Sequence, residues 1–106
     1  MKIGVSDMSE TSYYLTLTEV TRSIRMPEQT VITIVDHGIV EPRGKQPADW
    51  RFDPPMLITI RKACRLQRDL ELDWPGIALA LELIGQVQRL REDNRRLRRQ
   101  LDRLTW

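Results

Sequence analysis

With 106 residues, of which 41% are hydrophobic and 30% charged, the chain has the size and composition of one globular domain, which excludes disorder along its whole length. It contains one cysteine, Cys64, and one histidine, His37, so it offers neither an intramolecular disulfide nor a Cys/His metal cluster. No stretch approaches the roughly 20 apolar residues of a membrane span, and residues 1–10 hold no apolar run of signal-peptide length. We therefore expect a cytoplasmic protein with no cofactor, no metal and no membrane segment.

The formal net charge of +2 hides an uneven distribution along the chain. Residues 1–88 carry ten basic and twelve acidic side chains, whereas residues 89–106 carry seven arginines and three acids. A basic tail can contact phosphates, or it can form the solvated face of a charged helix. The acidic body lacks the broad basic surface that non-specific nucleic-acid binding uses, and this favours the solvated helix face.

The N-terminal part predicts a flexible lead-in followed by a strand end and a short helix. Residues 1–12 are polar and irregular, and the alternation of apolar and polar residues over 13–17 is typical of a strand. Thr18 is placed to cap a helix over 19–25, because its hydroxyl can accept a backbone N–H of the first turn. Glu19 would then lie favourably against the helix dipole.

A second short helix is predicted to follow after a tight turn. Pro27 suits its first turn, where the missing N–H would have no partner, and Gly38 supplies a left-handed residue that ends it after His37. The buried stripe of this helix is predicted to consist of Val31, Ile34 and Val35.

Two short extended segments are predicted next, over 39–41 and 50–52, around a Gly/Pro loop at 42–49. They indicate a small β hairpin, or wing. Asp53 followed by two prolines predicts the start of a third helix that ends near Leu70.

Asp73 and Pro75 open a fourth helix, which meets no strong breaker before Trp106. It carries a heptad pattern with a leucine at each d position, and the residues of this predicted dimerisation seam are Leu83, Val87, Leu90, Asn94, Leu97, Leu101 and Leu104. The alternative is one amphipathic helix packed on its own domain.

A polar residue at one of the a positions of the heptad fixes the register of the two helices. The Asn94 side chains of two copies meet only when the helices are parallel. Asp93 would then face Arg98 of the partner, whereas an antiparallel pair centred on Asn94 would oppose Arg91 and Arg98. The antiparallel arrangement stays open as the alternative.

The chain offers poor material for catalysis. His37 precedes the helix-ending Gly38, where a histidine commonly interacts with the helix C-terminus, and Cys64 lies on the apolar face of the third helix. The one Gly-containing basic loop, at 43–45, does not have the P-loop pattern. We therefore predict that the protein is not an enzyme and has no catalytic residues.

Two resemblances give these elements a family. The arrangement over residues 15–104 resembles the mainly α winged helix-turn-helix of MerR-type regulators, with a small β wing and a long C-terminal helix, and residues 38–42 look like the turn after the recognition helix. The segments 50–53, 72–78 (Leu-Asp-Trp-Pro-Gly-Ile-Ala) and 92–98 are similar to bacterial chaperone modulators of the CbpM type. That resemblance implies a non-enzymatic protein that binds the J-domain of the DnaJ-like co-chaperone CbpA and inhibits its co-chaperone and DNA-binding activities.

The composition of the second helix distinguishes a chaperone modulator from a DNA-binding regulator. MerR-type regulators present arginine and tyrosine on this helix, whereas here no Lys or Arg occurs between Arg25 and Arg43, and Glu28 and Asp36 lie at its ends. Such a helix is poorly suited to phosphate contacts or to reading guanine. DNA is therefore an unexpected partner.

A J-domain engages its chaperone through a basic helix. We therefore predict that the surface of this chain that binds a J-domain is acidic. The candidate partner-binding residues are Glu28, Asp36, Glu41, Asp69, Glu71, Asp73 and Trp74. Each acidic residue can also be ordinary solubilising charge, Asp73 can be a helix cap, and Trp74 can pack at the junction of the last two helices.

The leading hypothesis is thus a cytoplasmic, homodimeric modulator of a J-domain co-chaperone. It comprises a lead-in (1–12), a winged helix-turn-helix domain (13–72) and a long C-terminal helix forming a coiled coil (73–106). The first alternative is a MerR-like transcription regulator that holds DNA with its arginine tail and with Arg43, Lys45 and Arg51. The second is a coiled-coil interaction module without a chaperone.

Overall fold

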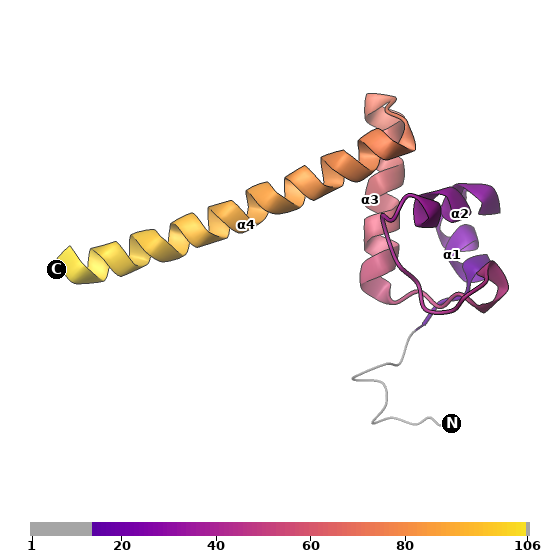
Figure 1. Ribbon diagram of the computed structural model, residues 1–106, viewed down its shortest axis with the longest axis horizontal. Helices are drawn as coiled ribbons and strands as arrows, with labels where there is room; N and C mark the ends of the chain where they lie inside the picture. Colours follow the sequence, from indigo (N-terminus) through magenta and orange to yellow (C-terminus); the bar gives the residue numbers. More distant parts are fainter. Residues whose placement is uncertain (1–13, 106) are drawn as a thin grey trace, which may run out of the picture.

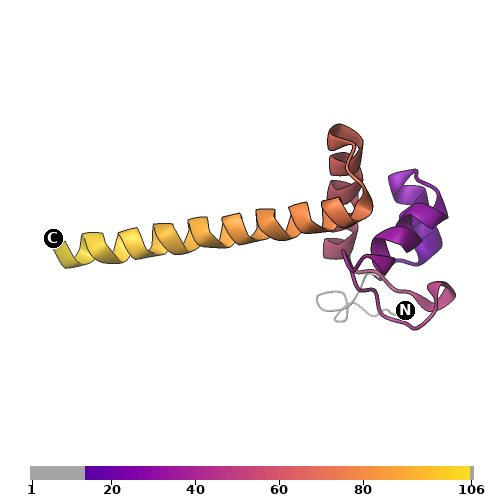
Figure 2. The same cartoon turned by 45° about the horizontal axis from the view of Figure 1, so that its top comes forward.

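A computed structural model describes residues 14–105, and it is mainly helical (Figure 1). The elements are α1 (Leu17–Ile24), α2 (Glu28–Asp36), the 3₁₀ helix η2 (Pro47–Asp49), α3 (Pro54–Leu70) and α4 (Trp74–Thr105). Both views place α1, α2 and α3 together in one body, from which α4 extends far beyond its neighbours (Figures 1 and 2). The radius of gyration is 18.0 Å, whereas a compact chain of about 100 residues has roughly 13 Å.

Helix α1 begins two residues earlier than predicted. Its N-cap is Thr16, not Thr18: the Thr16 hydroxyl accepts from the Glu19 amide at 3.2 Å, and the Glu19 carboxylate accepts from the Thr16 amide at 2.8 Å. This reciprocal capping box satisfies two backbone donors, whereas Thr18 alone would satisfy one. The helix ends at Ile24, and its C-cap Arg25 adopts a left-handed conformation.

Helix α2 begins and ends within one residue of the prediction. Pro27, predicted in the first turn, occupies the N-cap position just before it, and the helix ends at Asp36 with His37 as its C-cap. Gly38 follows with a φ of +74°, the left-handed conformation expected there. Val31 and Ile34 are fully buried and Val35 is partly buried against the same core, so the predicted stripe is confirmed.

The two long helices also begin and end close to the predicted residues. Asp53 caps α3, because its carboxylate accepts from the Met56 amide at 2.8 Å. Asp73 does the same for α4, accepting from the Gly76 amide at 3.0 Å. Helix α3 ends at Leu70, and Glu71 then takes a left-handed conformation that turns the chain into α4.

The predicted small β wing is wrong. Within residues 14–105 the chain forms isolated bridges in place of strands: Arg43 pairs with Arg51, and the next residue, Phe52, pairs with Leu15. Successive residues of an extended segment direct their backbone groups to opposite edges, so Arg51 and Phe52 bind different neighbours, and each pairing stops after a single bridge. On the far side of Arg43 the loop turns into η2. Leu15 lies in the predicted strand end, whereas Tyr13 and the predicted lead-in over 1–12 lie outside the described residues.

The core lies between the three body helices and the segment 50–52. Its largest fully buried side chains include Phe52, Ile34 and Ile60, and Trp50 meets Phe52 edge to face with ring centres 6.1 Å apart. Trp74, at the start of α4, is partly buried against this core cluster. The base of α4 is thus fixed to the body, which decides where the rest of this helix points.

None of the helices in the described part of the chain is long and apolar enough to cross a membrane.

Candidate protein-binding surfaces

The predicted seam lies along one side of α4, and no other described segment of the chain covers it. Every described residue of α4 after Gly85 is exposed. The leucines and the valine of the seam expose between 45% and 82% of their surface, and the full set is Leu83, Val87, Leu90, Leu97, Leu101 and Leu104. Asn94 is exposed among them. An apolar row of this length on a helix that leaves its body indicates an interaction surface.

The structure adds two residues to this row that the heptad pattern missed. Leu79 and Ile84 are also exposed, at 57% and 37%, and they occupy a g and an e position beside the seam. In a parallel pair a g residue meets the partner's e residue five positions further on, and these two are five positions apart. Reading the flanking positions as well as a and d would have found them.

The charges beside the seam remain available for a partner helix. Asp93 accepts from Arg96 on its own helix at 2.8 Å, and both side chains are about half exposed. An exposed pair of this kind contributes little stability, so Asp93 can exchange it for Arg98 of a second copy.

The acidic candidates divide into two groups, and all six are exposed. Asp69, Glu71 and Asp73 lie together at the connection between α3 and α4, which we call the acidic connection. Glu28 opens α2, and Asp36 and Glu41 lie at and after its other end.

Two members of the predicted set also have structural roles. Asp73 caps α4, as described, and Asp69 lies 3.5 Å from the Arg68 guanidinium. Trp74 is half buried against the core, which supports packing as its role. The acidic connection therefore offers exposed charge beside a residue, Trp74, that packs against the core.

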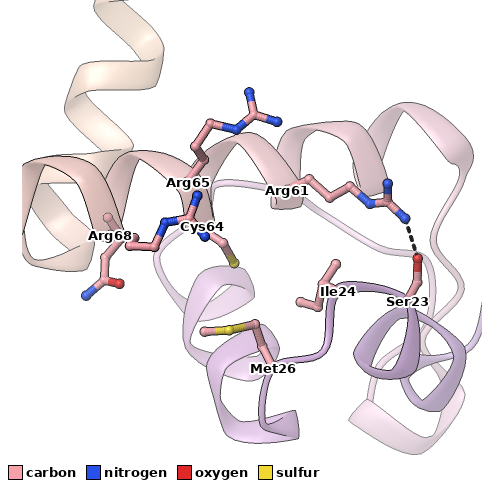
Figure 3. Close-up of a pocket in the computed structure, with 8 residues that line it drawn as sticks. Ser23, Ile24, Met26, Arg61, Cys64, Arg65 and Arg68 are labelled. Atoms are coloured by element: carbon pink, nitrogen blue, oxygen red, sulfur yellow. Dashed lines mark hydrogen bonds between the residues drawn. The ribbon is translucent and has the colours of Figure 1, made fainter.

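A third surface was not predicted from the sequence. A cavity of about 490 Å³ lies between the α1–α2 connection and α3. Ile24, Met26 and Cys64 point toward one another at its base (Figure 3). Three arginines of α3 line it: Arg61 reaches Ser23 and Arg68 lies beside Cys64, whereas Arg65 extends outward from α3. We call it the arginine groove, lined by Arg61, Arg65 and Arg68.

The residues considered for catalysis have structural surroundings. Nδ1 of His37 lies 2.9 Å from the Thr33 carbonyl oxygen, which is the helix C-terminal interaction predicted for it. Burial raises the pKa of the Cys64 thiol, and the nearby Arg68 offsets this only in part. Cys64 is therefore a protonated, weakly nucleophilic thiol near neutral pH. Across residues 14–105 no three His, Cys, Asp or Glu side chains are grouped to hold a metal.

Comparison with known proteins assigns the class. The family model described as "MerR HTH family regulatory protein" matches residues 15–99. The chain therefore belongs to the MerR helix-turn-helix family, which is a family of regulators and not of enzymes.

Similar proteins place the chain in a particular subgroup of this family. Proteins named chaperone modulatory protein CbpM are 53% identical in Pseudomonas putida and 51% in Pseudomonas entomophila, each over 71% of this chain and 74% of the relative. The Escherichia coli protein of the same name is 40% identical over 91% of this chain and 95% of its own length. Within the class, the chain is a member of the CbpM chaperone modulatory proteins.

Proposed function

We propose that the protein binds the J-domain of a CbpA-like co-chaperone and inhibits both the co-chaperone and the DNA-binding activities of that partner, in the cytoplasm. The observation that carries this proposal is the similarity to proteins named chaperone modulators, over as much as 91% of the chain. The acidic connection supports it physically. Three exposed carboxylates on a fixed turn complement the basic helix that a J-domain presents, and such complementarity mainly raises the association rate.

A role as a DNA-binding regulator is the second candidate, because the MerR family model covers most of the chain. In that role α1, α2 and the loop after them would form a winged helix-turn-helix. Helix α2 argues against it, since it carries no cation and has Glu28 and Asp36 at its two ends. Two of the loop cations are also engaged: Arg43 stacks over the Tyr14 ring at 4.9 Å, and Arg51 donates to the Trp50 carbonyl at 2.8 Å.

Titration of the purified protein into an isolated J-domain tests the proposal. We expect measurable heat at tens of micromolar and a loss of the co-chaperone's stimulation of chaperone ATP hydrolysis. Duplex DNA, titrated in parallel at low salt, should give no shift. Absence of heat together with unchanged ATPase stimulation would refute the modulator, and DNA binding with a steep salt dependence would favour the regulator.

We further propose that a second copy of this chain covers the α4 seam as a parallel coiled coil. In this arrangement Leu79 meets the partner's Ile84 and Asp93 meets the partner's Arg98, so both the apolar and the charged flanks match. An antiparallel pair centred on Asn94 would instead place Arg91 of one copy opposite Arg98 of the other, where their like charges would repel.

A cysteine added after Trp106, in a Cys64→Ser background, distinguishes the two orientations. Parallel helices bring the two added thiols together and should give an efficient disulfide between chains. A protein that sediments as a dimer but forms no such disulfide would contradict the parallel pairing.

A further inference from the structure

The arginine groove combines uncompensated positive charge with an apolar base. The side chains lining it include three arginines and no carboxylate. Within the described residues no carboxylate lies in salt-bridge distance of Arg61 or Arg65. The pair between Arg68 and Asp69 is long, at 3.5 Å, and both partners are more than half exposed, so it holds Arg68 only weakly.

The arginines are spaced to meet a row of acidic groups. They lie four and three residues apart on α3, which corresponds to about 6 Å and 4.5 Å along the helix axis. Arg61 donates to the Ser23 hydroxyl at 2.6 Å, so its guanidinium is positioned while its other N–H groups remain available. Figure 3 shows this hydrogen bond at one end of the groove.

The base of the groove decides which kind of anion fits. Ile24, Met26 and Cys64 come from two separate parts of the chain and leave an apolar patch below the arginines. Nucleic-acid phosphates have nothing apolar to place there, and the lining offers no aromatic ring on which a base could stack. An acidic polypeptide that alternates carboxylates with aliphatic side chains can place the carboxylates on the arginines and the aliphatic groups on the apolar base. Met26 suits this base because a methionine side chain accommodates aliphatic groups of varied shape.

We propose that the arginine groove is a docking site for an acidic segment of a protein partner, in which two or three carboxylates pair with Arg61, Arg65 and Arg68 and an aliphatic side chain rests on Met26 and Cys64. Arginine binds carboxylates with paired hydrogen bonds, which gives this site geometric selectivity as well as charge. The groove lies along α3 and the α1–α2 connection, so it is a different surface from the α4 seam, and its sign is opposite to that of the acidic connection.

The test uses the full chain and a fluorescein-labelled peptide of repeating Glu-Glu-Leu units, with a Gln-Gln-Leu peptide for comparison. We expect the acidic peptide to bind in fluorescence anisotropy and the glutamine peptide to bind at least tenfold more weakly. Arg61→Glu combined with Arg65→Glu should weaken binding at least tenfold. The matched control, Arg95→Glu with Arg99→Glu on the outer side of α4, makes the same change in net charge and should change the affinity by less than twofold.

Cys64 provides a second, local measurement. Because its thiol lines the base of the groove, the bound acidic peptide should slow its alkylation by iodoacetamide several-fold. Circular dichroism checks that each variant is folded, and Arg65→Gln offers a milder change at an exposed position. The proposal is overturned if the acidic peptide does not bind, if both charge-reversed variants lose affinity equally, if alkylation is unaffected, or if a duplex DNA displaces the peptide and protects Cys64 in its place. Since the assay contains no co-chaperone, its outcome is independent of the function proposed above.

Discussion

Replacing Leu97 and Leu101 with lysine should convert the proposed dimer into a folded monomer. Both side chains lie in the outer half of α4, where they touch nothing in the body and expose 55% and 59% of their surface. The substitutions therefore leave the core of α1, α2 and α3 intact. They place charge in the middle of the seam, where each lysine would face its counterpart in the second copy.

The size of the effect follows from the exposed leucine surface. Full burial of a leucine stabilises by roughly 1.5–3 kcal/mol, so covering the exposed half corresponds to about 1 kcal/mol for each side chain. Four leucines in the dimer then contribute about 4 kcal/mol, which is roughly a thousandfold in the dissociation constant before any charge repulsion is counted. A dimer that is stable at micromolar concentration would be monomeric at all practical concentrations.

Sedimentation equilibrium over a hundredfold range of concentration measures this shift, and circular dichroism reports the fold. The control is Asp102→Lys, which makes the same change in net charge at an outer position of the same helix. It should remain dimeric. If the double variant still sediments as a dimer, or if the unmodified protein is monomeric, the seam is not the dimer interface.

Three other changes test separate parts of the argument. Asp69→Lys with Glu71→Lys should slow association with a J-domain about tenfold with little effect on dissociation, as measured by stopped flow, and unchanged kinetics would move the binding face away from the acidic connection. Gly44→Ala should destabilise the protein more than Gly38→Ala in urea denaturation, because a Cβ at Gly44 would lie 2.5 Å from the Asp49 carbonyl oxygen whereas Gly38 has open space. Gly38→Ala should cost only about 1 kcal/mol of backbone strain, so equal losses would contradict this ranking. The raised pKa of Cys64 predicts stability that is fully present below the ordinary cysteine pKa and declines as pH rises through the folded value, a decline that Cys64→Ser should remove.

The helix ends were predictable because the groups that fix them are close in sequence. Asp53 with its two prolines, Asp73, and Gly38 each act on a backbone within three residues of themselves. The start of α1 was missed for a reason of the same kind. Thr16 and Glu19 form a capping box whose spacing is readable from the sequence, and the prediction considered Thr18 alone.

The β wing and the arginine groove depend on longer-range geometry. The residues of 50–52 have strand-like character, but whether they form a ladder depends on distant neighbours, and Leu15, which pairs with Phe52 on the edge opposite to Arg43, lies 37 residues away. The groove arises where α3 meets the α1–α2 connection, so Arg61 and Ser23 become neighbours across 38 residues of sequence. No local pattern records that contact.

The orientation of the α4 pair determines how a dimer would present its acidic connections. The acidic connection directly precedes Trp74, at the N-terminal end of the 32-residue helix α4. A parallel pair brings two acidic connections to the same end of the coiled coil, whereas an antiparallel pair separates them by roughly the helix length, about 48 Å at 1.5 Å per residue. Two linked J-domains could engage a parallel dimer simultaneously and gain affinity from their high effective concentration, whereas a short linker could not span the antiparallel one. Comparing a tandem J-domain with a single one therefore reports on the geometry of the seam, because only a parallel dimer predicts an avidity gain that Leu97→Lys with Leu101→Lys abolishes.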